Sequence, residues 1–207
     1  MGWWSERVLP RAVNRVLDTP EVNQRRARVC RGLAGTVLEV GFGSGLNVAF
    51  YPAEVRQVLA VEPSEVAWRL ADARRAASAV SFTRAGLDGQ RLELPDASVD
   101  AALSTYTLCT IPDLPAALNE IRRVLRPGGA LHFLEHGRSP DPSVASWQRR
   151  LTPVQSLLAG GCHLDRAIDT LIGAAGLEVV DLTCEYGSGP RPASYLYLGR
   201  ASEPARG

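Results

Sequence analysis

Two carboxylates and three closely spaced glycines near the start of the chain could together bind a nucleoside. The apolar run 36–40 is typical of a buried strand and carries Glu39 near its end. The glycines follow at once, at Gly41, Gly43 and Gly45. Glycine permits the unusual backbone angles of a tight turn and lets a ligand approach bare backbone. A second apolar run ends in Glu62, about 20 residues beyond the first glycine, the spacing at which a carboxylate can accept both ribose hydroxyls.

The spacing of the glycines argues against a dinucleotide. A dinucleotide-binding loop has its third glycine three residues after the second, where the helix packs beneath a pyrophosphate. Leu46 takes that place here, and Glu39 would be poorly placed beside phosphates but suits an ammonium group. Ribose and ammonium without phosphate describe S-adenosylmethionine, with S-adenosylhomocysteine as the product. The cofactor-binding residues predicted from this stretch are Glu39, Gly41, Gly43, Gly45, Asn47, Glu62 and Pro63.

The composition indicates one domain of ordinary size. The chain has 207 residues, of which 45% are hydrophobic and 22% are charged, as in soluble globular proteins. We expect residues 1–31 to form a helical lid over the cofactor, 32–201 the sheet core and 202–207 a tail. The net charge is only +1, and the sequence has no basic patch with interleaved aromatic residues, so nucleic acid is not expected as a partner.

The cysteines and the N-terminal segment bear on compartment and membrane contact. The four cysteines are scattered without a CxxC pair, which favours free thiols in a reducing cytoplasm and predicts no metal site. No apolar stretch approaches the ~20 residues that span a bilayer. Trp3 and Trp4 precede an Arg-rich segment that suits peripheral contact with a membrane, although a lid with its basic face in water is the favoured alternative. All 23 basic residues are Arg, which is typical of a GC-rich bacterial genome.

Apolar runs alternate with helical patterns from residue 36 onward, which predicts an α/β fold with a parallel sheet. A helix is expected to begin at Leu46, a second to cover 65–77, a third to follow Asp113 and to end at 126–129, and a fourth to begin near Leu164. The link between the last two strands is too short for a helical crossover, so they should be antiparallel. The predicted strands are 36–40, 57–61, 79–83, 99–104, 130–135, 177–184 and 193–200.

Longer segments carry a resemblance to a known family. The order E-x-G-x-G-x-G at 39–45, with Glu62 after the second strand, resembles the class I S-adenosylmethionine-dependent methyltransferases. Further segments resemble the methyltransferase type-11 group that includes the microsomal alkyl thiol methyltransferases. These segments are 7–11, 61–64, 103–113, 124–129, 133–137, 147–148 and 161–166, so the resemblance covers nearly the whole chain. It implies a Rossmann-like fold with a seven-stranded, mostly parallel sheet, an antiparallel last strand and helices on both faces.

The resemblance also implies roles on the cofactor side. In related enzymes an acid after the third strand meets the adenine amino group, and Asp88, followed by Gly89, takes that place. A plain Asp-Gly turn is the alternative. Ser104, at the end of the fourth strand, would pass beside the sulfonium, with simple strand packing as the alternative.

On the acceptor side, His136 follows the fifth strand and is the predicted catalytic base, because histidine exchanges a proton near neutral pH. A loop histidine bonded to backbone is the alternative. The residues expected to line the acceptor pocket are Tyr106, Cys109, Trp147, Cys162 and His163. For the two cysteines, burial as small hydrophobic residues is the alternative.

Methyl transfer from a sulfonium is a direct displacement in which the protein chiefly aligns the nucleophile. We expect a small-molecule acceptor, a thiol first of all, with a quinone ring or a phospholipid amine as the alternative. A non-catalytic module that binds S-adenosylmethionine is a further alternative, which the complete glycine loop disfavours. Segment 104–107 lacks the (Asp/Asn)-Pro-Pro-(Tyr/Phe) turn that grips nucleobase amines, which argues against those acceptors. A monomer or a homodimer is expected.

Overall fold

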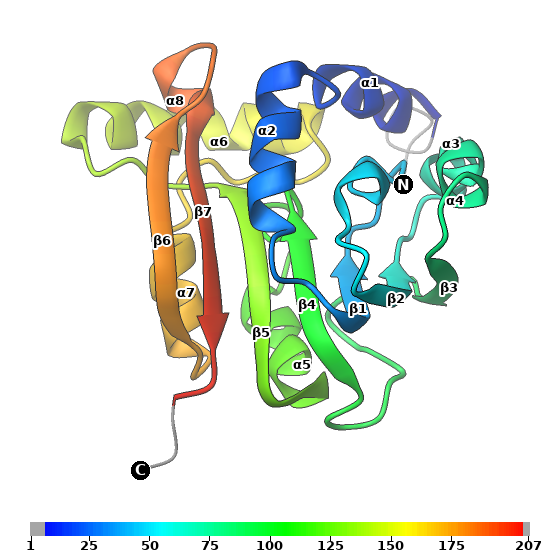
Figure 1. Cartoon of the computed structure of the whole chain (residues 1–207). Coiled ribbons are helices and arrows are strands. Elements are labelled where there is room, and N and C mark those ends of the chain that lie inside the picture. The colour runs from blue at the N-terminus through cyan, green and yellow to red at the C-terminus, as the bar shows by residue number, and fades with distance from the viewer. Residues whose placement is uncertain (1–6, 205–207) are drawn as a thin grey trace.

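A seven-stranded sheet in the order β3-β2-β1-β4-β5-β7-β6 forms the centre of the molecule (Figure 1). The computed structural model describes residues 7–204, so the expected membrane contact at Trp3 and Trp4 lies outside the described residues. Strands β1 to β5 pair in parallel, and β7 is antiparallel to both of its neighbours, as predicted. The strands are β1 (Gly35–Val40), β2 (Val55–Val61), β3 (Ser81–Gly86), β4 (Val99–Thr105), β5 (Leu125–His136), β6 (Glu178–Tyr186) and β7 (Tyr195–Ser202).

The helices begin where short polar side chains can cap them. The Asp113 carboxylate accepts the Ala116 N–H at 3.0 Å, and Thr19 and Asp141 cap two other helices in the same way. The helices are α1 (Leu9–Val16), α2 (Pro20–Val29), α3 (Glu65–Leu70), α4 (Asp72–Ala76), α5 (Leu114–Val124), α6 (Pro142–Leu158), α7 (Ile168–Ala174) and α8 (Arg191–Ser194). None of the helices in residues 7–204 combines the length and the apolar character that crossing a bilayer would require.

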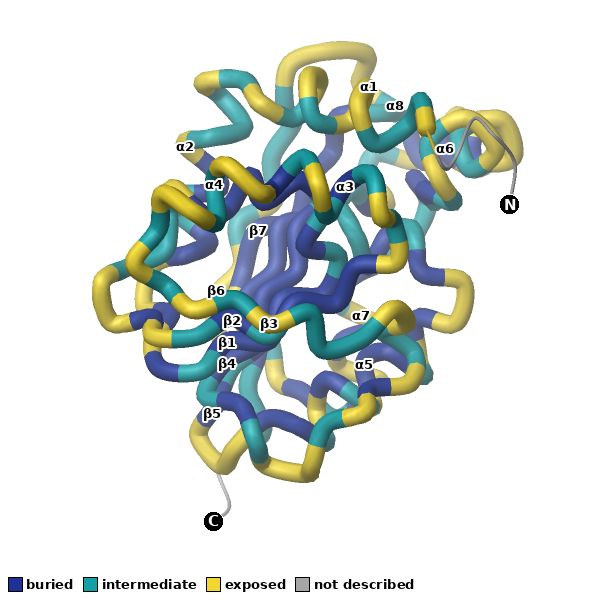
Figure 2. The backbone as a smooth tube through the Cα atoms, turned by 90° about the vertical axis from the view of Figure 1, so that its right-hand side faces the viewer, coloured by how far each residue is buried: buried dark blue, intermediate teal, exposed yellow. Residues whose placement is uncertain are grey.

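Successive strand residues bury their side chains on opposite faces of the sheet, which produces two cores. In β1, Leu38 packs on the side of α5 and α7, while Val37 packs on the side of α2. Glu39 lies one residue after Leu38 and therefore shares the α2 face. Figure 1 shows α1, α2 and α6 gathered at the end of the sheet to which β4 points, and Figure 2 shows the buried strands beneath these more exposed helices. Helices α1 and α2 of the N-terminal segment and α6, which follows β5, thus lie at the carboxyl ends of the parallel strands.

Two helix starts differ from the prediction. The helix expected from Leu46 is only the 3-10 turn η2 (Val48–Phe50). Pro52 disfavours helical geometry at the preceding residue, and Tyr51 accordingly has an extended backbone. The helix expected near Leu164 begins at Ile168, after a turn. Both changes leave irregular backbone at the carboxyl edge, where it carries side chains of the candidate site.

Candidate active site

The glycine loop after β1 and Glu62 after β2 lie side by side and are joined by a hydrogen bond. Gly41, Gly43 and Gly45 all have positive φ, the backbone region that favours glycine. A Cβ on Gly41 would overlap the Thr107 side chain, so the loop also needs glycine for close approach. The Glu62 carboxylate accepts the N–H of Gly43 at 2.7 Å and that of Ser64 at 2.6 Å. Burial raises the pKa of Glu62, and these backbone bonds oppose that effect.

Glu39 is fully buried beneath the loop and belongs to a polar network. It accepts hydrogen bonds from Asn47 Nδ2 at 2.7 Å and from the Tyr51 hydroxyl. Burial raises the pKa of Glu39 to about 7, even though both bonds favour the charged form. Tyr51 reaches this position because the 3-10 turn ends before it. The carboxyl group that the sequence assigns to an ammonium partner is therefore poised between its neutral and charged states near neutral pH.

Arg26 of α2 completes the network, and the sequence reading missed it. Its Nη1 donates to Asn47 Oδ1 at 2.7 Å and to Thr105 Oγ1 at 3.0 Å. The side chain is buried, and its Nε has no hydrogen-bond partner. Burial lowers the pKa of Arg26, because removal from water disfavours the charged form. Nothing in the sequence separates Arg26 from the other arginines of α2, since only the docking of that helix selects it.

Asp88 and Gly89 lie in the loop after β3. Asp88 is exposed, and its Oδ1 accepts both the backbone and the side-chain N–H of Gln90, each at 2.9 Å. These bonds lower the pKa of Asp88. A Cβ on Gly89 would come within 2.9 Å of Val40 Cγ1, so the glycine brings this loop against the end of β1. Pro63 is exposed beside Glu62. The loop thus lies beside the end of β1, and the adenine role of Asp88 stays a prediction.

Ser104 is fully buried and donates to Glu135 Oε1 at 2.7 Å. Glu135, which the sequence reading did not single out, also accepts the backbone N–H groups of Thr107 at 3.1 Å and Cys109 at 3.2 Å. Burial raises the pKa of this carboxyl group, with the hydrogen bonds opposing it. Glu135 therefore fixes the β4–α5 loop, and the Ser104 hydroxyl is engaged with Glu135. A direct role of Ser104 toward the cofactor stays a prediction.

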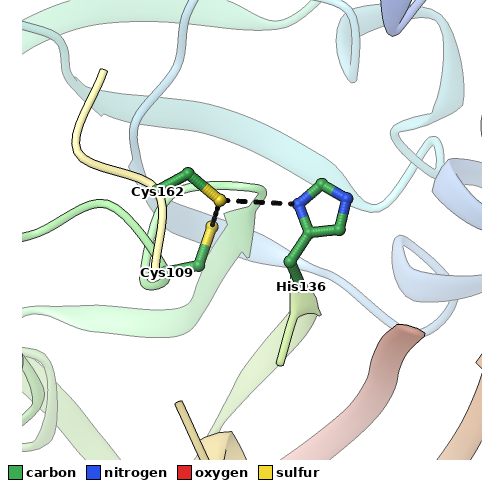
Figure 3. A group of neighbouring side chains, drawn as sticks. All are labelled: Cys109, His136 and Cys162. Atoms are coloured by element: carbon green, nitrogen blue, oxygen red, sulfur yellow. Dashed lines mark hydrogen bonds between the residues drawn. The ribbon is translucent and has the colours of Figure 1, made fainter. Parts of the chain in front are cut away.

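The fold brings His136, Cys109 and Cys162 together from three distant segments (Figure 3). The two Sγ atoms are 3.7 Å apart, and Cys162 Sγ is 3.9 Å from His136 Nδ1. The hydrogen bond with Cys109, and then His136, lowers the pKa of Cys162 against the effect of burial. Both cysteines are buried, as the alternative interpretation expects, but they are also within reach of a histidine.

Tyr106 and His163 border this cluster. The Tyr106 and His136 rings are 5.0 Å apart, and the Arg26 guanidinium lies 5.7 Å from the Tyr106 ring. Tyr106 has a φ of 56°, an uncommon backbone angle for a residue with a side chain. His163 donates its backbone N–H to the Cys109 carbonyl at 2.8 Å. Tyr106 is therefore the side chain that links the cofactor network to the Cys–His cluster.

Trp147 is the one expected pocket residue that lies on an exposed helix face. It is 54% exposed on α6, with the Arg150 guanidinium 5.5 Å from its ring. Its neighbour Gln148 is buried instead, donates to the Gly137 carbonyl at 3.0 Å and accepts the Ser139 N–H at 2.8 Å. The segment 147–148 thus fastens α6 to the chain after β5 through Gln148, while Trp147 faces outward.

The residues present fit S-adenosylmethionine. The buried Arg26 Nε without a partner suits a carboxylate, and Glu39 with Asn47 suits an ammonium group. Above Gly43 the space for a Cβ is open, with only the Gly41 carbonyl within 4 Å, so a ligand can lie against that backbone. Glu62, directly after β2, is the carboxylate that two ribose hydroxyls would need.

Comparison with known proteins gives matches throughout the chain. The family described as "Methyltransferase domain" matches residues 38–133. The thiol S-methyltransferase TMT1B of Mus musculus is 33% identical over 177 residues, which is 82% of this chain and 70% of that protein. Across the rat, human and mouse thiol S-methyltransferases the matched part spans from 55% to 70% of the relative's length.

Two further matches broaden the comparison. The phosphatidylethanolamine N-methyltransferase of Cereibacter sphaeroides is 27% identical over 173 residues, 82% of each chain. Among solved structures, a SAM-dependent methyltransferase of Thermotoga maritima superimposes with a TM-score of 0.67 at 20% identity, covering 97% of this chain and all of the other. That likeness shows the fold.

Proposed function

Because the chain belongs to the S-adenosylmethionine-dependent methyltransferases, we propose that it transfers the methyl group of that cofactor to a small-molecule thiol. One observation carries the choice of a thiol: a Cys–His cluster lies beside the cofactor network, joined to it through Tyr106. The similarity to thiol S-methyltransferases supports the same choice. A thiol, whose ordinary pKa is about 8.5, loses its proton beside a histidine at neutral pH far more readily than an alcohol does.

In this proposal the cofactor is held by four side chains with distinct tasks. Glu62 accepts hydrogen bonds from the ribose hydroxyls of the cofactor, and Glu39 accepts one from its ammonium group. Arg26 donates a hydrogen bond to the cofactor's carboxylate through its unpartnered Nε. Asp88 reaches the adenine amino group from the loop after β3. The cofactor supplies a methyl group on a positively charged sulfur, which is a good leaving group.

The chain's part in the reaction is alignment. The acceptor sulfur must arrive as a thiolate: it forms a bond to the methyl carbon while the carbon–sulfonium bond breaks, and that electron pair stays on the departing thioether sulfur. The thiol proton has to leave before this step. We assign Tyr106, His136 and the two buried cysteines to the surroundings of the acceptor sulfur.

The experiment separates acceptor classes. The purified protein is incubated with S-adenosylmethionine and with separate pools of thiols, quinols, phenols and lipid amines, and release of S-adenosylhomocysteine is followed. We expect release with thiols. Release with another pool alone would overturn the thiol assignment while leaving the cofactor assignment intact.

Cofactor binding is tested independently by calorimetry on Arg26→Met. Loss of a buried charge-assisted hydrogen bond costs about 1.5–3 kcal/mol, so affinity should fall roughly 10- to 150-fold. Arg31→Met, an exposed arginine just beyond α2, is the matched control and should bind normally. Equal affinities of the two variants would contradict the role of Arg26.

A second candidate is an acceptor dissolved in a lipid surface, such as a phospholipid amine or a quinone. The outer face of α6 favours it, because Trp147, Leu151, Val154 and Leu157 are exposed at helical spacing. Arg149 and Arg150 of the same helix are exposed, and so are Arg7, Arg11 and Arg15 in and before α1. The end of α6 adjoins α1, since a Cβ on Gly160 would come within 2.9 Å of Leu9 Cδ2. An apolar stripe accompanied by exposed arginines suits an anionic bilayer. In this candidate the protein is cytoplasmic and binds the membrane surface.

Co-sedimentation with phosphatidylglycerol vesicles tests this second candidate. Val154→Ser should weaken sedimentation several-fold, whereas Val180→Ser removes a valine of comparable exposure from β6 and should not. Equal sedimentation of the two variants, or none for the native protein, would remove the lipid surface from consideration. Methylation of soluble thiols would be unaffected by that result.

A further inference from the structure

The Cys–His cluster has the composition of a metal site. Cys109, His136 and Cys162 each offer one ligand atom, and these atoms all lie within 4.8 Å of one another (Figure 3). Cys109 comes from the β4–α5 loop, His136 ends β5, and Cys162 precedes α7. The sequence predicted no metal because these residues are far apart along the chain. The fold nevertheless brings their ligand atoms together.

The distances agree with tetrahedral zinc. Zinc–sulfur bonds of roughly 2.3 Å at a tetrahedral angle place two sulfur ligands about 3.8 Å apart, and a sulfur and a nitrogen ligand about 3.6 Å apart. The two Sγ atoms here are 3.7 Å apart, and Cys162 Sγ is 3.9 Å from His136 Nδ1. The third pair, Cys109 Sγ and the His136 ring nitrogen, lies within 4.8 Å, so side-chain shifts of up to about 1 Å complete the geometry. A disulfide would instead require the sulfurs to approach to about 2.05 Å.

Backbone hydrogen bonds and one close backbone approach, rather than contacts between the sulfur atoms, hold the segments of Cys109 and Cys162 together. The His163 N–H donates to the Cys109 carbonyl at 2.8 Å, and the Cys109 N–H donates to Glu135. Gly161 has a φ of 91°, and a Cβ there would come within 2.8 Å of the Thr110 carbonyl oxygen. Glycine before Cys162 therefore permits the close approach of two segments 53 positions apart. Such fixed supports are what a metal site needs around its ligands.

We propose that Cys109, His136 and Cys162 bind one zinc ion and leave its fourth position open for the sulfur of the acceptor. Two cysteines and one histidine with an open position are an established ligand set for catalytic zinc. Thiolates are soft ligands and select zinc over magnesium or calcium. The metal would hold the acceptor as a thiolate and release its proton to solvent, which replaces the general-base role predicted for His136. This role rests on the proposed thiol function, whereas the site itself rests on the three side chains.

Metal content and cobalt spectra test the site without reference to activity. The full chain is purified from zinc-supplemented medium under reducing conditions, and bound zinc is measured by mass spectrometry. We expect about one equivalent, and cobalt substitution should give sulfur-to-cobalt charge-transfer bands in the near ultraviolet. Cys109→Ser, Cys162→Ser and His136→Ala should each weaken zinc binding at least tenfold. Cys184→Ser, at an exposed cysteine outside the cluster, should bind zinc as the native chain does.

Three results would overturn the proposal, and none depends on a variant that fails to fold. The first is a native chain without zinc and without cobalt–sulfur bands. The second is retention of the metal by all three variants with unchanged circular dichroism. The third is full thiol methylation by metal-free protein, which would remove the role in catalysis while the proposed function stands. If zinc binds but no thiol is methylated, the proposed function and the metal's role fail together, and cofactor calorimetry remains the separate measure of the methyltransferase site.

Discussion

The two halves of the candidate site are built in different ways. The cofactor half is mostly contiguous: Glu39 lies near the end of β1, the glycine loop follows that strand directly, and Glu62 follows the adjacent strand β2. The acceptor half is assembled from residues that are separated by whole elements, with Cys109, His136 and Cys162 on three different segments. A motif can be recognised when one turn contains it. A cluster whose residues come from three distant segments leaves no comparable pattern in the sequence.

The halves also differ in how they are supported. Backbone N–H groups hold Glu62, and glycine geometry shapes the loop above it. On the acceptor side one buried carboxylate, Glu135, gathers a hydroxyl and two backbone N–H groups from the loop that carries Cys109. The first half should therefore be most sensitive to added volume and the second to the loss of a single charge. The following predictions test that contrast.

Gly41→Ala should have the largest effect. The new methyl group would overlap Thr107, and the residue has a φ of 77°, which costs an L-residue roughly 1–2 kcal/mol even without a clash. We expect the affinity for S-adenosylmethionine, measured by calorimetry, to fall at least about 100-fold. Gly32→Ala is the matched control, because Gly32 has a φ of 78° but nothing within 4 Å of its Cβ position. If both variants lose affinity equally, backbone strain rather than close packing explains why position 41 needs glycine.

The mostly parallel sheet, the antiparallel last strand and the glycine turn after the first strand could be predicted, because each leaves a local signal of apolar runs, glycine spacing or a short link. Arg26 could not, since α2 carries several arginines and only helix docking selects one. Glu135 was hidden inside an apolar strand whose pattern reads as core. Tyr51 reaches Glu39 only because a proline shortens the expected helix to one turn. What escaped prediction depends on tertiary contacts between residues far apart along the chain.

Glu135→Gln should separate the two halves. The amide keeps one acceptor oxygen, but its nitrogen cannot accept a hydrogen bond, so one buried N–H of the β4–α5 loop loses its partner. That loss costs about 2 kcal/mol, which corresponds to a factor of ~30. We expect kcat/KM for the thiol to fall by about that factor, mainly through KM, with cofactor affinity within about threefold of native. Ser104→Ala keeps both backbone bonds to the carboxylate and should cost less. Equal losses on the cofactor and acceptor sides would show that the halves are one unit.

Glu39 should make cofactor affinity depend on pH. Its pKa in the folded chain is about 7, above the ordinary value of 4.5, because burial favours the neutral form. For the unliganded protein, the stability contributed by this group is fully present below pH 4.5 and is lost as the pH rises through 7. The cofactor's ammonium group prefers the charged form, so affinity should rise roughly eightfold between pH 6 and 7.5.

Calorimetry on Glu39→Gln provides the comparison, because that variant cannot titrate here while the ligand's own ionisation is unchanged. The native chain should also release protons on binding, which appears as a dependence of the measured heat on the buffer. The same pH dependence in both proteins would assign the effect to the ligand and contradict the role of Glu39.

Asp88→Ala should have the smallest effect, because this carboxylate is exposed and a hydrogen bond in contact with water contributes little. We expect about a threefold loss of cofactor affinity. Both bonds from Gln90 use Oδ1, which leaves Oδ2 to accept from the adenine amino group. A cofactor analogue whose purine lacks that amino group should bind the native chain and Asp88→Ala equally well. If the substitution weakens both ligands alike, Asp88 only shapes its turn, and the cofactor half then ends at Glu62.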